Sequence, residues 1–155
     1  MCWHEAGGQD PNRCSLWGPM ALNLASVVRR NMKETGRFER DVAPPGWTPL
    51  EATEHVFGTY KNPEPWASAS LCFTSAGIWP VDPTGSLLIR WVDLVGWETP
   101  EKERPQGVIV HTRAGGSVLL RCVGTSGPHG RYKDAFSLLM VVKTVVEVGR
   151  GGANL

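Results

Sequence analysis

The chain of 155 residues has the length of one ordinary domain. Apolar residues make up 41% and charged residues 20%, which suffices for one core and excludes a disordered chain. The formal charge is +1, so the whole chain lacks the electrostatic signature of a nucleic-acid or anionic-membrane binder. The sequence shows neither the apolar run of about 18–20 residues that a transmembrane segment needs nor the features of a signal peptide. We therefore predict a soluble, cytoplasmic protein that binds no nucleic acid.

The cysteine spacing gives no indication of a zinc ribbon or a thioredoxin-like site, because no CxxC pair occurs. Without a signal peptide, reduced thiols are expected rather than disulfides. Cys2, His4 and Cys14 are metal-capable residue types, but a structural metal site normally needs a fourth ligand. The sequence therefore predicts no metal and no cofactor.

Residues 1–18 are rich in glycine and turn-forming residues and show no periodicity, so we expect an irregular leader outside the folded domain. Residues 19–155 are expected to form a single α+β domain. Its first part, 19–62, is predicted to be helical.

Two helices are expected in this first part. The earlier one carries an apolar stripe at helical spacing and ends near Gly36; the stripe consists of Met20, Leu24, Val27, Val28 and Met32. The later one begins at the cap Thr48, has Pro49 in its first turn and is completed by Glu51, and it is expected to run to about Tyr60.

Residues 67–122 change from helical to alternating periodicity, which predicts antiparallel strands. Apolar segments recur at 70–74, 78–81, 87–91, 94–97, 108–112 and 118–122, with a strong turn at 82–85. Since the connections are too short for parallel crossovers, we expect a bent sheet or partly open barrel of five to seven strands.

Residues 132–148 carry the clearest helical stripe of the chain. Its apolar positions are Ala135, Leu138, Leu139, Val142, Val145 and Val146. A sheet of this size exposes too much apolar surface to be stable alone, so this helix is expected to cover it.

The segments 71–78 (LCFTSAGI), 89–94 (IRWVDL) and 108–116 (VIVHTRAGG), followed by the amphipathic helix 134–148, resemble the bacterial pleckstrin-homology-like domains. The resemblance covers about residues 50–148. It implies a bent antiparallel sheet, usually of seven strands, plugged by a C-terminal helix. The first helical part and the loop 124–130 lie outside this pattern.

The candidate binding residues combine aromatic and basic side chains, because tryptophan is enriched at binding hot spots and a basic rim can meet phosphates in pleckstrin-like folds. They are Trp79, Trp97, Arg113, Arg121, His129, Arg131 and Lys133. The alternative interpretation is that the tryptophans complete the core and that the charges are solvated.

Catalytic motifs are missing: the sequence has no Walker loop, dinucleotide fingerprint, HExxH or GxSxG. Ser126, His129, Tyr132 and Asp134 would be the residues of an acid–base group, but a glycine-rich loop is usually mobile and unshielded. His55 and His111 are expected on the surface.

The sequence thus predicts a non-catalytic binding module with a pleckstrin-homology-like fold, acting on a protein partner or on an anionic lipid headgroup. Two alternatives stay open: a small cytoplasmic immunity or inhibitor protein that blocks a toxin or enzyme, and an enzyme of unrecognised type.

Overall fold

The first described element is α1 (Leu24–Met32), in a computed structural model that describes residues 23–101, 106–124 and 130–152. The Asn23 side chain caps the helix by accepting a hydrogen bond from the Ser26 amide at 3.0 Å. Val27, Val28 and Met32 are buried, as their spacing predicts. A 3₁₀ turn, η3 (Lys33–Thr35), continues the helix to Gly36, whose φ of 72° ends it.

The prediction of a second N-terminal helix is wrong. Residues 41–55 form a loop, and the next elements are strands: β1 (Phe38–Arg40) before the loop and β2 (Val56–Lys61) after it. The VFGTYK stretch of β2 is rich in β-branched and aromatic residues, which favour a strand between two neighbours over an isolated helix. The expected cap is also replaced, since the Leu50 amide donates to the Glu54 carboxylate at 2.7 Å.

Sheet A is antiparallel and contains six strands in the described part of the chain. Its path runs β1–β2–β3–β4–β5, and β6 pairs with β4 beside β5. The remaining members are β3 (Ser70–Thr74), β4 (Gly77–Asp82), β5 (Gly85–Ser86) and β6 (Ile89–Arg90). A short 3₁₀ turn, η4 (Trp91–Asp93), leads out of this sheet.

Sheet B is an antiparallel meander of three strands, again within the described residues. It consists of β7 (Leu94–Glu98), β8 (Gly107–Thr112) and β9 (Ser117–Arg121). The two sheets stay separate rather than forming one sheet, so the expectation of a single bent sheet or partly open barrel is wrong, as is its range of five to seven strands. The α+β class and the antiparallel pairing are confirmed.

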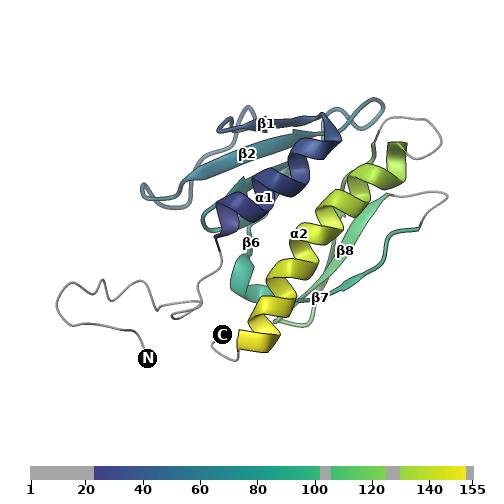
Figure 1. Cartoon of the computed structure of the whole chain (residues 1–155). Coiled ribbons are helices and arrows are strands. Elements are labelled where there is room, and N and C mark those ends of the chain that lie inside the picture. Colours follow the sequence, from purple (N-terminus) through teal and green to yellow (C-terminus); the bar gives the residue numbers. More distant parts are fainter. Residues whose placement is uncertain (1–22, 102–105, 125–129, 153–155) are drawn as a thin grey trace.

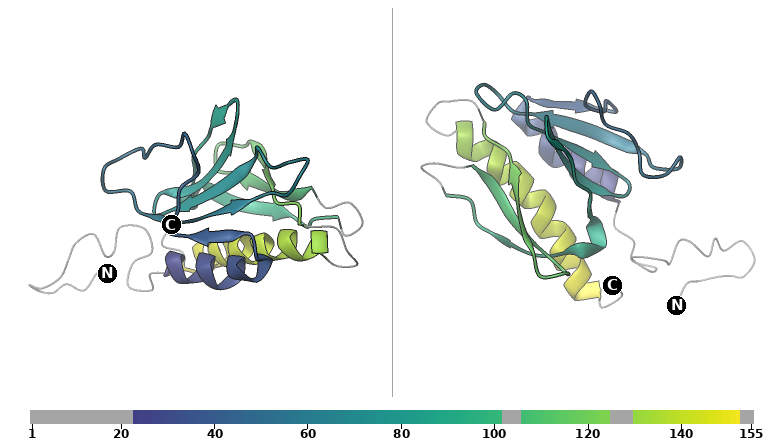
Figure 2. Two further views of the ribbon diagram at one scale, coloured as in Figure 1. Left: turned by 90° about the horizontal axis from the view of Figure 1, so that it is seen from above. Right: turned by 180° about the vertical axis from the view of Figure 1, so that it is seen from behind.

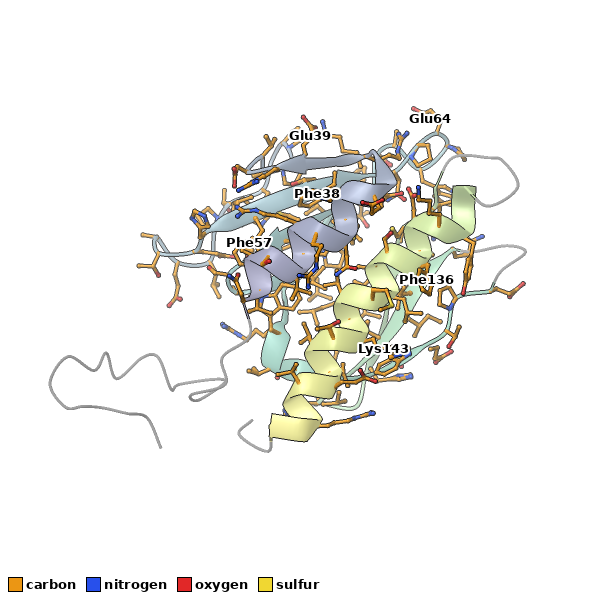
Figure 3. All side chains as sticks on the ribbon, viewed as in Figure 1. Phe38, Glu39, Phe57, Glu64, Phe136 and Lys143 are labelled. Atoms are coloured by element: carbon orange, nitrogen blue, oxygen red, sulfur yellow. The ribbon has the colours of Figure 1, made fainter. Side chains whose placement is uncertain are left out.

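The C-terminal helix α2 (Gly130–Gly152) is confirmed, and it is longer than its stripe predicts. It lies beside α1 (Figure 1), and both helices form one layer against the strands (Figure 2). All six predicted stripe residues of α2 are buried. Figure 3 shows Phe136 and Lys143 along the same helix, and Phe136 is 44% exposed.

Asn62, directly after β2, joins the two sheets. It is 2% exposed, and its amide group donates to the carbonyls of Ala69 (2.9 Å) and Arg121 (3.1 Å). Its side-chain oxygen accepts from the Val123 amide at 2.8 Å. One buried side chain therefore satisfies three backbone groups where no strand pairing is available.

The predicted leader 1–18 lies outside the described residues. Among the described helices, none has the length and apolar character needed to cross a bilayer.

Candidate functional site

Trp79 lies in the protein interior. It lies on β4, is 8% exposed, and its indole N–H donates to Glu54 Oε2 at 2.7 Å. Thr74 donates to the same oxygen, and the Trp47 ring meets the Trp79 ring edge-on at 5.7 Å. The packing interpretation therefore describes this tryptophan better than the recognition interpretation.

The Glu54 carboxylate is held ionised by this network. Burial acts to raise its pKa, but the hydrogen bonds from Thr74, the Leu50 amide and Trp79 together outweigh burial and lower the pKa below its ordinary value. Glu54 thus fixes the loop 41–55 against sheet A.

Trp97 packs partly buried against the core from β7. The Arg150 guanidinium of α2 lies 5.7 Å from the centre of its ring, and Arg150 Nη2 donates to the Val95 carbonyl at 2.9 Å. Trp97 therefore anchors the last turns of α2 on the edge of sheet B.

Arg121 ends β9 and stacks on an aromatic ring that lies far from it in the sequence. Its guanidinium is 3.9 Å from the centre of the Trp66 ring, and its Nη1 donates to Gln106 Oε1 at 2.6 Å. Trp66 is 37% exposed, so the stack is accessible to solvent. The sequence supplies no signal for this pairing, because it depends on the long-range link through Asn62.

The outer face of sheet B is the side opposite α2. Register pairs place Glu98, Ile109 and Leu119 in one row across the sheet and His111 and Ser117 in the next. Their neighbours Val108, Val110 and Leu120 are buried on the other side. We define the outer face by Glu98, Ile109, His111, Ser117, Leu119 and Arg121.

A chain of polar contacts crosses this outer face. His111 Nε2 lies 3.3 Å from Glu98 Oε2, and its Nδ1 lies 2.9 Å from Ser117 Oγ. The ring lies over Gly96, where an added Cβ would make an ordinary van der Waals contact with His111 Cδ2 at 3.4 Å. His111 is partly exposed, which agrees with its predicted surface position.

Arg113 lies at the other end of β9 from Arg121, in the turn between β8 and β9. Its Nε and Nη2 donate to the Val92 carbonyl at 3.3 and 2.9 Å, and its amide donates to the Asp93 carbonyl at 2.8 Å. These bonds tie the turn to η4.

Between the turn and the β5–β6 connection lies a pocket of about 460 Å³. Its apolar walls are Leu87, Leu88, Ile89, Ala114 and Val118. Its polar lining is Asp93, Thr112 and Arg113.

The remaining predicted residues cluster around the start of α2. His129 lies outside the described residues, as does Ser126 of the alternative acid–base group. The structure describes the backbone of Arg131 in α2 but not its side chain. Lys133 is exposed.

Asp134 is 4% exposed and accepts a hydrogen bond from the Tyr60 hydroxyl at 2.6 Å. Burial raises the pKa of Asp134, and the bond from Tyr60 and the charges of Arg37 and Lys133 offset this rise only in part. Burial also raises the pKa of Tyr60 and of Cys122, whose thiol donates to the Asp134 carbonyl at 3.3 Å. This carboxyl is therefore a structural partner of Tyr60.

Cys72 and Cys122 are free, buried thiols within sheet A and directly after β9. Burial raises the pKa of Cys72 to about 11. Among the described residues, no three His, Cys, Asp or Glu side chains gather as a metal site would require.

The structure does not bring together into one site those predicted binding residues whose side chains it describes. Trp79 and Trp97 pack against the protein, while Arg121 and Arg113 belong to two separate surface features at opposite ends of β9. No protein-family model, curated protein or solved structure matches the chain.

Proposed function

We propose that the chain is a non-catalytic binding module with a pleckstrin-homology-like fold that recognises another protein through the outer face of sheet B. The antiparallel pairing of the described strands and the position of α2 after both sheets support the fold assignment. The strands form two sheets, whereas the resemblance implies one bent sheet.

The stack of Arg121 on Trp66 is the observation that carries the proposal. Arginine and tryptophan are the residue types most enriched at interaction hot spots. Here the arginine is already held by Gln106 and by the ring, so little side-chain freedom is left to lose on binding. Exposed Leu119, at 37%, and half-buried Ile109 add an apolar centre next to the stack.

The charges of this face favour a protein over an anionic lipid surface. Glu98 and Glu101 line a hollow of about 250 Å³ that Ile109 and Leu119 also line. Carboxylates beside a single arginine oppose approach to an anionic bilayer, whereas a protein partner can pair with both signs.

The test is a comparative capture experiment with the full chain and three variants. Trp66→Ala and Leu119→Asp alter the outer face, and Leu50→Asp is the control, because Leu50 is exposed to a similar extent (52%) in the loop 41–55. Each tagged protein is incubated with lysate of the cells that make it, and bound proteins are quantified by mass spectrometry. Thermal melting of each variant verifies the fold.

We expect a protein that the wild type and Leu50→Asp retain and that both face variants lose by about tenfold or more, as hot-spot truncations do. Equal retention by all four proteins would overturn the proposal. Binding to anionic vesicles alone would replace it with the lipid-headgroup interpretation. If the captured partner is an enzyme or toxin that loses its activity in the complex, the module is an inhibitor.

A further inference from the structure

The pocket between the β5–β6 connection and the β8–β9 turn does not overlap the outer face of sheet B. Its wall residue Val118 pairs with Val110 on the side of sheet B that faces the core. Any ligand of this pocket is thus independent of the proposed protein recognition.

The walls of the pocket are held in place before any ligand binds. Three hydrogen bonds join Arg113 to the backbone of η4, at Val92 and Asp93. The Leu87 amide donates to the Pro80 carbonyl at 3.2 Å, which fixes the opposite wall. A pre-formed cavity of several hundred Å³ with apolar walls and a few polar groups is typical of small-molecule sites.

The apolar side of the pocket is incompletely covered. Leu87 is 54% exposed, and its neighbour Leu88 is half-buried, so two consecutive leucines line a solvent-accessible cavity. A ligand with an aliphatic or aromatic group would remove this apolar surface from water.

The polar side of the pocket carries one charge of each sign. The Asp93 carboxylate has no hydrogen-bond or ion-pair partner among the residues that the structure describes, and it forms no ion pair with Arg113. The Arg113 guanidinium uses Nε and Nη2 on a single carbonyl, and its remaining N–H groups can still donate to an anion. Both side chains line the same cavity.

We propose that this pocket binds a free α-amino acid with an apolar side chain. The ammonium group pairs with Asp93, the carboxylate pairs with Arg113, and the side chain lies against Leu87, Leu88 and Val118. A free amino acid matches the charges because it carries an ammonium and a carboxylate on one carbon. A residue inside a peptide carries neither, so a peptide segment would leave the charges unsatisfied.

The proposal is tested by titrating the ¹⁵N-labelled full chain with leucine and following amide chemical shifts. Leucinamide, which lacks the carboxylate, and 4-methylpentanoate, which lacks the ammonium, are the matched analogues, and glycine lacks the side chain. We expect leucine to shift the amides around η4 and the β8–β9 turn. Leucinamide and 4-methylpentanoate should each bind about tenfold more weakly or worse, which is the effect of one charge-assisted contact. Glycine should also bind more weakly, because it lacks the apolar side chain.

One substitution and a control assign the partner of the ammonium group. Asp93→Asn should remove the preference for leucine over 4-methylpentanoate, while Glu34→Gln, a charge loss on η3, should leave it unchanged. Because the analogue series uses the wild-type chain, the test does not depend on the stability of a variant. Equal binding of leucine and 4-methylpentanoate, shifts on another surface, or no shifts at the solubility limit of leucine would each overturn the proposal.

Discussion

Asn62 shows how much structure a single buried side chain can hold. It satisfies three backbone groups at the junction of the two sheets. A single sequence does not reveal this role, because an asparagine before a proline is typical of a turn. Of the residues that it joins, Ala69 directly precedes β3, Arg121 ends β9 and Val123 follows that strand.

Asn62→Ala is therefore expected to lower the free energy of unfolding by about 2–4 kcal/mol, since it leaves the Val123 amide and the Arg121 carbonyl without their partner. Asn31→Ala is the control, because Asn31 donates to one carbonyl on its own helix and is only half-buried, and its loss should cost less than about 1 kcal/mol. Urea unfolding measures both. Equal losses of unfolding free energy in the two variants would mean that the hydrogen bonds of Asn62 stabilise the fold no more than the single bond of Asn31 does.

Asp134 predicts a specific pH dependence. Because burial raises the pKa of its carboxyl above the ordinary value of 3.8, the folded state holds the proton more tightly than the unfolded state does. Stability from this group is therefore fully present at low pH and is lost as the pH rises from about 4 through the folded pKa.

Asp134→Asn should remove this loss while keeping an acceptor for Tyr60. The measurement is the difference in unfolding free energy between wild type and variant across the acidic range, since other carboxylates cancel in the difference. The wild type should weaken relative to the variant as the pH rises. A difference that is flat or opposite in sign would contradict the raised pKa.

At the scale of elements, periodicity identified those whose burial comes from one amphipathic face. The α2 stripe and the alternating strands of sheet B belong to this class. The helix prediction for residues 48–60 was wrong because it rested on local capping signals. The pairing of β2 with β1 and β3 involves residues farther away in the chain, which those signals do not report. Long-range pairing outweighed a local helix signal.

The α2 stripe leads to a direct test with two positions one turn apart. Leu139→Asp should destabilise the domain by more than about 4 kcal/mol, because Leu139 is buried against the core and the new carboxylate would be removed from water without an ion-pair partner. Phe136→Asp, on the exposed side of the same helix, should cost about 1 kcal/mol or less. Similar melting temperatures of both variants would show that the Leu139 side of α2 is not the side that packs against the core.

β2 contains a glycine that its neighbour strand requires. Gly58 has φ +155°, and a Cβ there would lie 2.2 Å from Phe38 Cζ and 2.7 Å from the Glu39 carbonyl of β1. Gly85 has a similar φ of +140° with no atom within 4 Å of its added Cβ. Gly58→Ala should therefore destabilise the protein clearly more than Gly85→Ala in urea unfolding, because only the former adds a clash to the backbone strain. Equal losses of stability in the two variants would mean that the positive φ alone, and not the clash with β1, causes the destabilisation.

At the scale of the whole molecule, the fold class followed from the order of patterns along the chain, but the division into two sheets did not. That division depends on η4 and on Asn62, which turn the chain and join the sheets. The candidate sites were predicted in part: Arg113 and Arg121 were named from the sequence, but their partners Val92 and Trp66 were not. Side-chain partners from distant segments leave no periodic signal.

The contact of Arg150 with β7 also affects how copies of the protein behave at high concentration. Strand edges with unpaired carbonyls can template the addition of a strand from another molecule. On β7 the Val95 carbonyl instead accepts from Arg150, whose guanidinium also covers Trp97. The last turns of the C-terminal helix thus occupy an acceptor on this edge that an added strand would otherwise use, which makes the edge a poorer template for association between copies.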